Sequence, residues 1–368
     1  MNEQTDTFRA PGLLIVLMGC IAMWTTVALA DARPGRTGGT TAAPVDLDPL
    51  EALGRISAEA AAVDARAAEA TAPEGTDDAS TSVSHPLLPP ALAALDDGVL
   101  SSAMLHHPPF AAEVERWIGF WSNSFSDWMP VYLSRMTSFE SMVDETLAAH
   151  GLPWSLRYLP VIESGYSPGA VSSAKAVGLW QFMAPTAVGF GIEVSDHVDD
   201  RRDPFVSTDA AAKYLVELRE EFGSWFLALA AYNAGPDRIK GLLERYLPDV
   251  EPSDAAYWSL RNVLPDETAA FVPNLLGAIV VASDPAAHGY ALPEPVPFDF
   301  ESVPVLGSIS FEGAARAASA SAEEIARLNP EYVRGVTPPG RQVELRLPPG
   351  RSAAFRAFFA TDDPASGR

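Results

Sequence analysis

A single cysteine, Cys20, is present in this chain of 368 residues. One thiol cannot form an intramolecular disulfide or supply a cysteine-ligated zinc site, so the fold must be held together by side-chain packing alone. A hydrophobic content of 48% is sufficient for globular cores, and the chain length predicts two or three domains. The 32 prolines and several alanine-rich stretches indicate that part of the chain is linker.

Charge and composition exclude several classes of protein. The sequence has 25 Lys and Arg against 48 Asp and Glu, a net charge of −23 that repels phosphate backbones and anionic headgroups. We therefore expect no nucleic-acid partner. The six histidines show no zinc-helix spacing, and the sequence has no glycine-rich loop with a lysine to cradle phosphate. We expect neither a metal nor another cofactor.

Residues 1–30 predict an export segment. The apolar run from Leu13 to Val27 is short for a membrane span, and Ala28-Leu29-Ala30 is the small-x-small pattern that a signal peptidase cleaves. Two alternatives stay open: lipidation of Cys20, which follows Leu17-Met18-Gly19, and an uncleaved membrane anchor. Each interpretation places the rest of the chain outside the cytoplasm, in the periplasm or cell envelope, with membrane contact only through this segment.

Composition divides the remainder of the chain. Residues 31–91 are rich in Ala, Pro, Gly and Thr and predict a disordered tether, because they offer too little apolar surface to become ordered. Residues 92–290 predict the main folded domain. Prolines mark residues 291–302 as a linker, after which we expect a small module at 303–350 and a tail at 351–368.

The main domain is predicted to be predominantly α-helical. Aromatic residues gather at 117–132, where their helical spacing favours a core position over sugar stacking. Glycines and prolines then separate segments with apolar residues three and four apart, and Ser207 or Thr208 is the candidate N-cap of one helix. The predicted helices span residues 139–147, 153–165, 207–222 and 225–234.

Glu163 is the strongest local signal for chemistry. It ends the apolar helix that begins Leu159-Pro160-Val161-Ile162. A carboxyl among apolar side chains stays protonated to higher pH, because desolvation penalises the anion, and it can then donate a proton to a leaving oxygen. Cleavage of a glycosidic bond requires such a general acid. An isolated Glu at a helix end is more often simply exposed to water. The neighbouring motifs therefore decide whether Glu163 is interpreted as a catalytic or a surface residue.

Three further segments have the residue types of a sugar-binding groove. Residues 172–176 are small apart from one lysine, residues 178–186 read GLWQFMAPT, and residues 230–235 read AAYNAG. Glycines and alanines let a sugar approach the backbone, while Gln, Met, Tyr and Asn offer donors, acceptors and apolar surface. Each segment alone is equally typical of a turn or a helix end. Together they predict the floor of a groove beside Glu163.

In this order and spacing, the motifs resemble the soluble lytic transglycosylase domain of the goose-lysozyme-like glycosidases. The resemblance extends from about Val114 to Ala282 and includes Asp203-Pro204 and the stretch Leu264 to Thr268. Within this family the chain most resembles the membrane-bound lytic murein transglycosylase D group. The resemblance implies a mainly α, lysozyme-like domain of the α+β superfamily.

The resemblance also implies a role for each matching residue. Glu163 corresponds to the single catalytic acid and base, and Ser164 to a residue that supports its geometry. The family commonly has a tyrosine where this chain has Phe271, so a hydroxyl that would contact Glu163 or the sugar is missing. The residues that correspond to substrate-binding positions are Ser164, Ser172, Gln181, Met183, Tyr232 and Asn233.

The reaction implied by the resemblance is cleavage of the β-1,4 bond between MurNAc and GlcNAc in peptidoglycan. Glu163 would protonate the leaving oxygen and then deprotonate the sugar's own C6 hydroxyl, which closes onto C1 and leaves a 1,6-anhydro end. A hydrolase needs a second carboxylate. The nearest downstream acids lie at 193–203, in a proline-bounded loop where solvated surface positions and helix caps are the favoured interpretation. A goose-type lysozyme and a non-catalytic wall-binding protein remain as alternatives.

The C-terminal module is predicted to have β-α-α-β order. Two strands, at 303–310 and 343–347, flank short helices at 311–318 and 322–328.

This module resembles a degenerate LysM repeat. Ile325 to Pro330 and Leu345 to Pro348 stand where that family has its second helix and closing strand, while Ser310-Phe311-Glu312 replaces the usual Gly-Asp-Thr. The resemblance implies binding to N-acetylglucosamine stretches of peptidoglycan, and a structural appendage without sugar affinity is the alternative. Peptidoglycan glycan strands are thus the expected partner, with other cell-wall enzymes as further candidates.

Overall fold

The computed structural model describes residues 88–89, 92 and 97–361, all of which lie in the compact unit Leu47–Arg368. The predicted export segment and most of the predicted tether lie outside the described residues. Among those described, no helix is both long enough and apolar enough to cross a bilayer.

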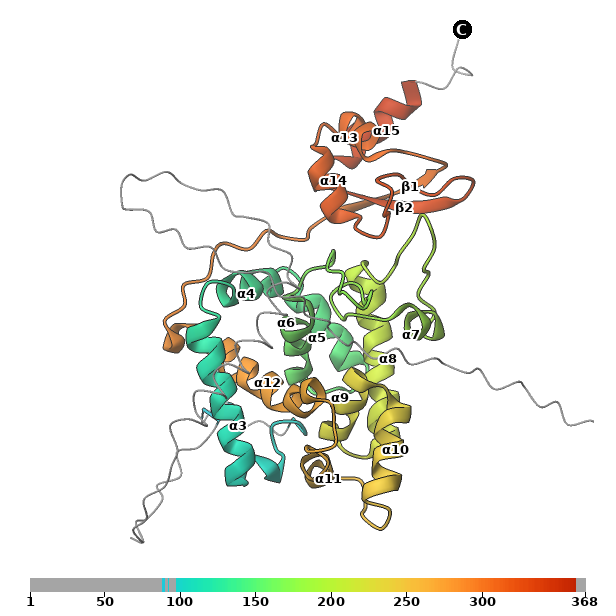
Figure 1. Cartoon of the computed structure of the whole chain (residues 1–368). Helices are drawn as coiled ribbons and strands as arrows, with labels where there is room; N and C mark the ends of the chain where they lie inside the picture. The colour runs from blue at the N-terminus through green and yellow to red at the C-terminus, as the bar shows by residue number, and fades with distance from the viewer. Residues whose placement is uncertain (1–87, 90–91, 93–96, 362–368) are drawn as a thin grey trace, which may run out of the picture. The chain divides into compact units, whose positions relative to one another are not determined.

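A mainly helical domain precedes a small C-terminal module, as predicted (Figure 1). Short 3-10 segments and one π-helical turn, Phe120–Ser124, connect the α-helices of the helical domain. These helices are α3 (Pro108–Gly119), α4 (Met129–Thr137), α5 (Glu140–Ala149), α6 (Leu159–Ser164), α7 (Ala184–Gly189), α8 (Pro204–Phe222), α9 (Trp225–Ala234), α10 (Pro236–Tyr246), α11 (Asp254–Ser259) and α12 (Asp266–Ser283).

Helix α9 forms the centre of the helical domain. Its first seven residues, 225–231, are all buried, and it packs against α8, α10, α11 and α12 (Figure 1). A helix that is apolar on every face needs such neighbours on every side. Its start is fixed by Ser224, whose hydroxyl accepts a hydrogen bond from the Leu227 N–H at 3.2 Å. Gly235 and Pro236 follow its last residue, so its bounds are those predicted.

The aromatic cluster at 117–132 belongs to the core. Trp117, Trp121, Phe125 and Tyr132 are all buried, and the Trp121 indole donates to the side-chain oxygen of Asn274 on α12 at 2.8 Å. The interpretation of these rings as core rather than as a sugar-stacking surface is confirmed.

Helix α8 begins earlier than predicted. Asp203, not Ser207 or Thr208, is its N-cap, because its carboxylate accepts hydrogen bonds from the backbone N–H groups of Phe205 and Val206 at 2.8 and 3.0 Å. The hydroxyls of Ser207 and Thr208 instead donate back to the carbonyls one turn earlier. Pro204 occupies the first helical turn, where its missing N–H costs nothing.

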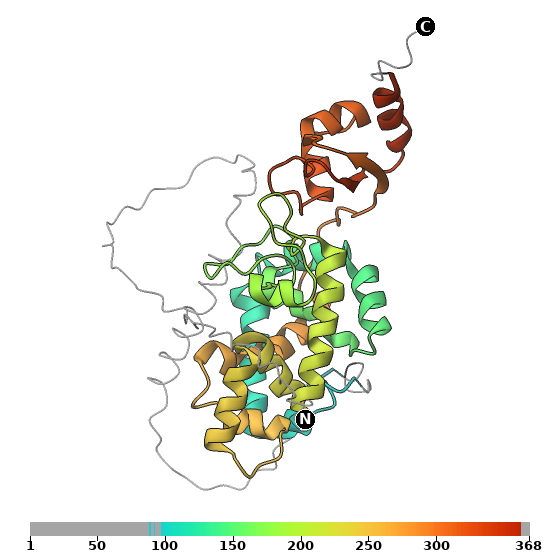
Figure 2. The same ribbon diagram turned by 90° about the vertical axis from the view of Figure 1, so that its right-hand side faces the viewer.

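The C-terminal module has the predicted β-α-α-β order. Strand β1 (Glu301–Leu306) pairs antiparallel with β2 (Gln342–Leu347), with Glu301 opposite Leu347. Helices α13 (Phe311–Ala318) and α14 (Ala322–Leu328) have their predicted bounds and lie against the two strands (Figure 2). Buried side chains of these helices and strands form an apolar core.

The predicted linker and tail both contain side chains that pack on folded parts of the chain. Residues 352–361 form a further helix, α15 (Ser352–Thr361), because Phe355 is buried in the core of the module. Within the predicted linker, the Phe298 ring packs on Phe139, with ring centres 4.9 Å apart. Apolar side chains thus order parts of both segments.

Candidate active site

Glu163 lies in the last turn of α6, a short helix whose other residues are buried. Gly165 ends the helix in the left-handed conformation at φ 57°, and the Tyr166 N–H returns to the Pro160 carbonyl at 3.1 Å. Only glycine fits at residue 165, because a Cβ atom would lie 2.3 Å from the Tyr132 ring. This cap against a core tyrosine fixes where the helix stops and therefore where Glu163 is placed.

The surroundings of Glu163 favour its protonated form. Its side chain is half-buried. Burial, and secondarily the charge of the nearby Glu267, raise the pKa of its carboxyl from 4.5 to about 8. No hydrogen bond to this carboxyl offsets the cost of ionisation among the residues that the structure describes. At neutral pH the group therefore holds a proton that it can donate.

Ser164 connects α6 to residues 178–186, the next of the predicted groove segments. Its side chain is 1% exposed, and its hydroxyl donates to the Leu179 carbonyl at 2.8 Å. The same oxygen accepts a hydrogen bond from the Ser167 N–H at 3.3 Å. This geometry suits a residue that supports Glu163 rather than one that touches substrate.

The turn of residues 175–182 follows a tight path against Arg201. Gly178 has φ 87°, and a Cβ atom there would lie 1.8 Å from the Arg201 carbonyl oxygen, so no other residue fits. The Arg201 guanidinium in turn donates to the carbonyls of Lys175 and Phe182, both at 3.1 Å. One buried arginine thus clamps both ends of this turn.

Three of the predicted groove residues lie in or beside this turn. Gln181 is half-buried at a positive φ of 51°, and its side chain donates to the Gly178 carbonyl at 2.8 Å. Met183 precedes α7 and is 43% exposed. The Ser172 hydroxyl accepts from the Ala176 N–H at 2.9 Å and so orders the loop before the turn.

Backbone strain is concentrated in residues 166–181, the segment that follows Glu163. Non-glycine residues with positive φ are rare, yet Tyr166, Lys175 and Gln181 all adopt it, at 56°, 69° and 51°. Of the other described residues apart from glycines, only Ser319 does so.

The other two predicted groove residues come from the end of α9. The Tyr232 hydroxyl donates to the Trp180 carbonyl at 2.6 Å, which ties α9 to the turn. Burial, and then the charge of Glu163, raise the pKa of Tyr232 well above its usual value, so the two side chains are neighbours. Asn233 accepts a hydrogen bond from Thr268 at 2.6 Å. The buried Phe271, also on α12, brings no hydroxyl to this region.

Glu267 is a second acid at this site and was not predicted from the sequence. It is exposed at the start of α12, accepts a hydrogen bond from the Asn233 amide at 3.2 Å and acts electrostatically on Glu163. The stretch Leu264 to Thr268, which is part of the family resemblance, contains Glu267. The proximity of Glu267 to α6, however, depends on tertiary packing and could not be predicted from that stretch.

The acids at 193–203 have other partners. Asp199 forms a bidentate pair with Arg201, with both contacts at 2.8 Å, and Asp203 caps α8. Burial, followed by the charges of Asp203 and Glu193, raises the pKa of Asp200 to about 6. Asp203 is thus a helix cap and Asp196 is exposed, as the favoured interpretation has it, whereas Asp199 is buried. Among the described residues no cluster of His, Cys, Asp and Glu is arranged to hold a metal ion.

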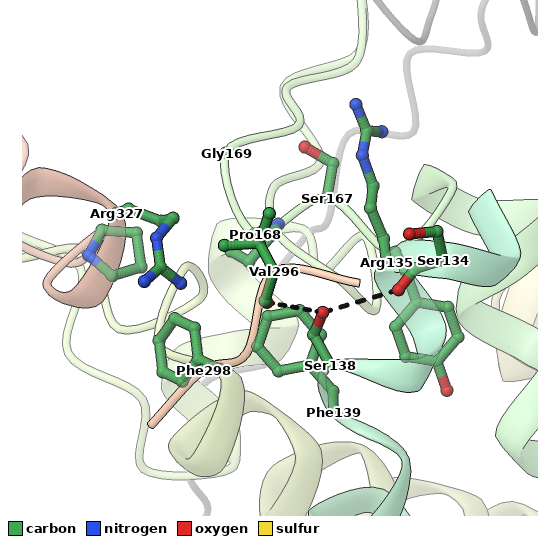
Figure 3. Close-up of a pocket in the computed structure, with 12 residues that line it drawn as sticks. Ser134, Arg135, Ser138, Phe139, Ser167, Pro168, Gly169, Val296, Phe298 and Arg327 are labelled. Atoms are coloured by element: carbon green, nitrogen blue, oxygen red, sulfur yellow. Dashed lines mark hydrogen bonds between the residues drawn. The ribbon is translucent and has the colours of Figure 1, made fainter. Parts of the chain in front are cut away.

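A cavity of about 420 Å³ lies apart from the residues described above (Figure 3). Its lining includes residues at the end of α4 and, from much later in the chain, Val296 and Phe298. The Ser138 hydroxyl donates to the Val296 carbonyl at 2.8 Å, and Phe298 and Arg327 line the wall. Neither Glu163 nor any predicted groove residue lines it, so this cavity is distinct from the candidate active site.

Comparison with known families classifies both parts of the chain. Residues 142–246, which contain α6, the turn and the end of α9, match the transglycosylase SLT domain. Residues 299–362 match the LysM-like domain of lytic transglycosylase MltD. The chain is 34% identical over 143 residues to membrane-bound lytic murein transglycosylase D of Escherichia coli K12, which covers 39% of this chain and 31% of that protein. The resemblance inferred from the motifs is confirmed.

Two solved structures are also similar. An inactive mutant of lytic transglycosylase Slt from Pseudomonas aeruginosa shares 25% identity over 43% of this chain and 25% of that chain, with a TM-score of 0.33. The 70 kDa soluble lytic transglycosylase of Escherichia coli shares 23% identity over 40% of this chain and 24% of its own, also with a TM-score of 0.33. The chain thus spans less than a third of each of these three relatives.

Proposed function

We propose that the protein is a lytic transglycosylase that cleaves the MurNAc–GlcNAc β-1,4 bond of peptidoglycan without water. One observation carries the proposal: Glu163, at the end of a buried helix, has a pKa of about 8 and so remains protonated at neutral pH. The matching family model, a transglycosylase domain, and the name of the curated relative, a lytic murein transglycosylase, support the reaction class and the substrate.

The proposed reaction uses one carboxyl in two steps. Glu163 donates its proton to the glycosidic oxygen as the bond from that oxygen to muramic-acid C1 breaks. The resulting carboxylate then accepts the proton of the C6 hydroxyl on the same sugar, whose oxygen bonds to C1. The products are a free GlcNAc hydroxyl and a 1,6-anhydro end, and Glu163 regains its proton. Because the attacking hydroxyl belongs to the substrate, proximity replaces a positioned water.

The surrounding residues are proposed to orient the glycan. Gln181 and Met183 would contact it from the turn, and Tyr232 and Asn233 would contact it from the end of α9, with Ser172 beside them. Since the Tyr232 hydroxyl already donates to the Trp180 carbonyl, it would act toward a sugar as an acceptor. Glu267 would keep Glu163 protonated through like-charge repulsion.

Glu267 also favours one alternative, a goose-type lysozyme. A hydrolase needs a second carboxylate to activate water or to stabilise the sugar cation, and Glu267 is exposed, held by Asn233 and close enough to Glu163 to act on its charge. The two reactions differ in product: a hydrolase leaves reducing ends, whereas a transglycosylase leaves anhydro ends.

The cellular setting is proposed from the relatives. A membrane-bound murein transglycosylase works on the cell wall, so we place this chain in the cell envelope, with glycan strands as its partner. Cleavage after Ala30, lipidation of Cys20 and an uncleaved anchor remain alternative hypotheses for its export segment. Binding of the LysM-like module to N-acetylglucosamine, and contacts with other cell-wall enzymes, are further parts of the proposal.

A digest of purified peptidoglycan sacculi tests the proposal. The full chain, its Glu163→Gln variant and a Glu115→Gln control on the exposed side of α3 are incubated with sacculi, and products are analysed by mass spectrometry. We expect muropeptides lighter by one water from the wild type and the control, and none from Glu163→Gln. Products with reducing ends would refute the proposal and show that the protein is a hydrolase of the goose-type lysozyme kind. The absence of product from all three proteins would favour a non-catalytic wall-binding protein.

A further inference from the structure

The loop of residues 193–203, which belongs to the helical domain, packs against the C-terminal module and pairs with its backbone. The Asp199 N–H donates to the Glu331 carbonyl at 2.9 Å, and Val198 forms a β-bridge with Tyr332. Val198 is 2% exposed and lies in the apolar core of the module. The contact therefore includes backbone pairing and a shared core, which a loosely tethered module would not have.

A half-buried arginine of the module lies in this contact. Arg346, on β2, pairs with Asp203 and approaches Glu331 at 3.4 Å; the three side chains are 13%, 5% and 6% exposed. The rings of Phe205 and Phe300 lie on the guanidinium, with centres 5.3 and 5.1 Å away. Arg346 thus neutralises an acid of the helical domain inside an apolar enclosure.

The same loop extends to the candidate active site. Asp199, whose N–H is bonded to the module, holds the Arg201 guanidinium at 2.8 Å. Arg201 donates to the carbonyls of Lys175 and Phe182 and so clamps the turn that carries Gln181. A continuous series of buried contacts therefore runs from β2 of the module to the turn beside Glu163.

We propose that the C-terminal module positions the catalytic turn and that Arg346 is a positioning residue for the reaction. The inference rests on the proposed function, and it assigns the module a role that needs no sugar affinity. Removal of Arg346 leaves Asp203 buried without its cation, next to Glu331. The uncompensated charge destabilises the loop of residues 193–203. Arg201 in this loop then no longer fixes the backbone of residues 175–182 as firmly.

Kinetics separate positioning from substrate capture. Soluble glycan strands prepared from peptidoglycan are cleaved by the full chain, by Arg346→Met and by Arg316→Met, a control at an exposed position on α13 of the same module. For Arg346→Met we expect kcat at least about tenfold lower with KM nearly unchanged, because a misplaced turn affects the transition state. For Arg316→Met we expect wild-type values. A raised KM with unchanged kcat for Arg346→Met would mean that the module only concentrates substrate, which would overturn the inference.

Amide hydrogen exchange gives a readout that does not depend on activity. Residues 175–183 are expected to exchange faster in Arg346→Met than in the wild type and in Arg316→Met, while α9 is unchanged. Unaltered exchange in that turn would refute the positioning role. If the wild type cleaves nothing, the proposed function fails while the exchange measurement still decides the inference. Should Arg346→Met not fold, Arg346→Lys keeps the charge but not the planar fork, and it should produce the same pattern more weakly.

Discussion

Replacing Glu163 with glutamine is expected to stabilise the folded protein, increasingly so as the pH rises. In the folded chain, burial and then the charge of Glu267 raise the pKa of this carboxyl from 4.5 to about 8. Between these values the folded state holds a proton that the unfolded state gives up, so the wild type loses stability as the pH rises through this window. Glutamine is neutral throughout and escapes that loss.

The size of the effect follows from the pKa. Each tenfold change in proton affinity corresponds to about 1.4 kcal/mol. A pKa raised from 4.5 to about 8 therefore destabilises the wild type by roughly 5 kcal/mol at alkaline pH. At about pH 7 the cost is roughly 3 kcal/mol. At about pH 5 it is only roughly 1 kcal/mol, since this pH lies just above the pKa at which the unfolded carboxyl begins to lose its proton.

Urea unfolding followed by tryptophan fluorescence measures the difference. Midpoints for the wild type, Glu163→Gln and the Glu115→Gln control are compared at about pH 5, 7 and 9. We expect the midpoint of Glu163→Gln to rise above that of the wild type by an amount that grows with pH. Glu115→Gln should follow the wild type, because Glu115 is exposed.

A difference between Glu163→Gln and the wild type that is constant with pH would refute this reasoning. It would mean that Glu163 ionises at its ordinary pKa in the folded chain, and the carboxyl would then be deprotonated at neutral pH. The general-acid role proposed for it would fail with the same measurement.

Three further predictions concern rate, packing and binding. Initial rates on sacculi should fall on the alkaline side above about pH 8 as Glu163 loses its proton, and Glu267→Gln should move that fall to lower pH because a like charge is removed. Gly178→Ala should lower Tm by several degrees or prevent folding, because its Cβ atom meets a backbone oxygen at 1.8 Å, whereas Gly189→Ala, with open space around it, should not. Co-sedimentation with sacculi should vary little with salt, since a chain of charge −23 gains nothing from anionic wall polymers; loss of binding at moderate salt would contradict this.

Local sequence signals determine the helices that were predicted accurately. Helices α9, α13 and α14 have their predicted bounds because a serine precedes each and its hydroxyl caps the first turn. The predicted start of α8 was wrong because Asp203, Ser207 and Thr208 are all plausible N-caps in the sequence. In the structure Asp203 is the N-cap, and its side chain also pairs with Arg346 of the module.

The candidate site was predictable only where its residues are close in sequence. Glu163 ends an apolar helix, so burial and the direction of its pKa follow from its own segment. Glu267 lies on α12, far along the chain, and its approach to Glu163 depends on the packing of helices. The role of the loop at 193–203 was equally hidden, because its contacts with the C-terminal module, such as Asp199 with Glu331 and Asp203 with Arg346, join residues more than a hundred positions apart.

The positive φ angles of Lys175 and Gln181 have a consequence for efforts to make this protein more heat-resistant. Each residue stores conformational energy, on the order of 1 kcal/mol, that glycine or asparagine would release. Tyr166 also has a positive φ, but its fully buried ring makes any smaller residue costly there. A search guided by thermal stability alone would therefore converge on Lys175 and Gln181. Variants selected in that way would alter the turn that carries the predicted groove residues, so the most heat-resistant of them should also be among the slowest enzymes.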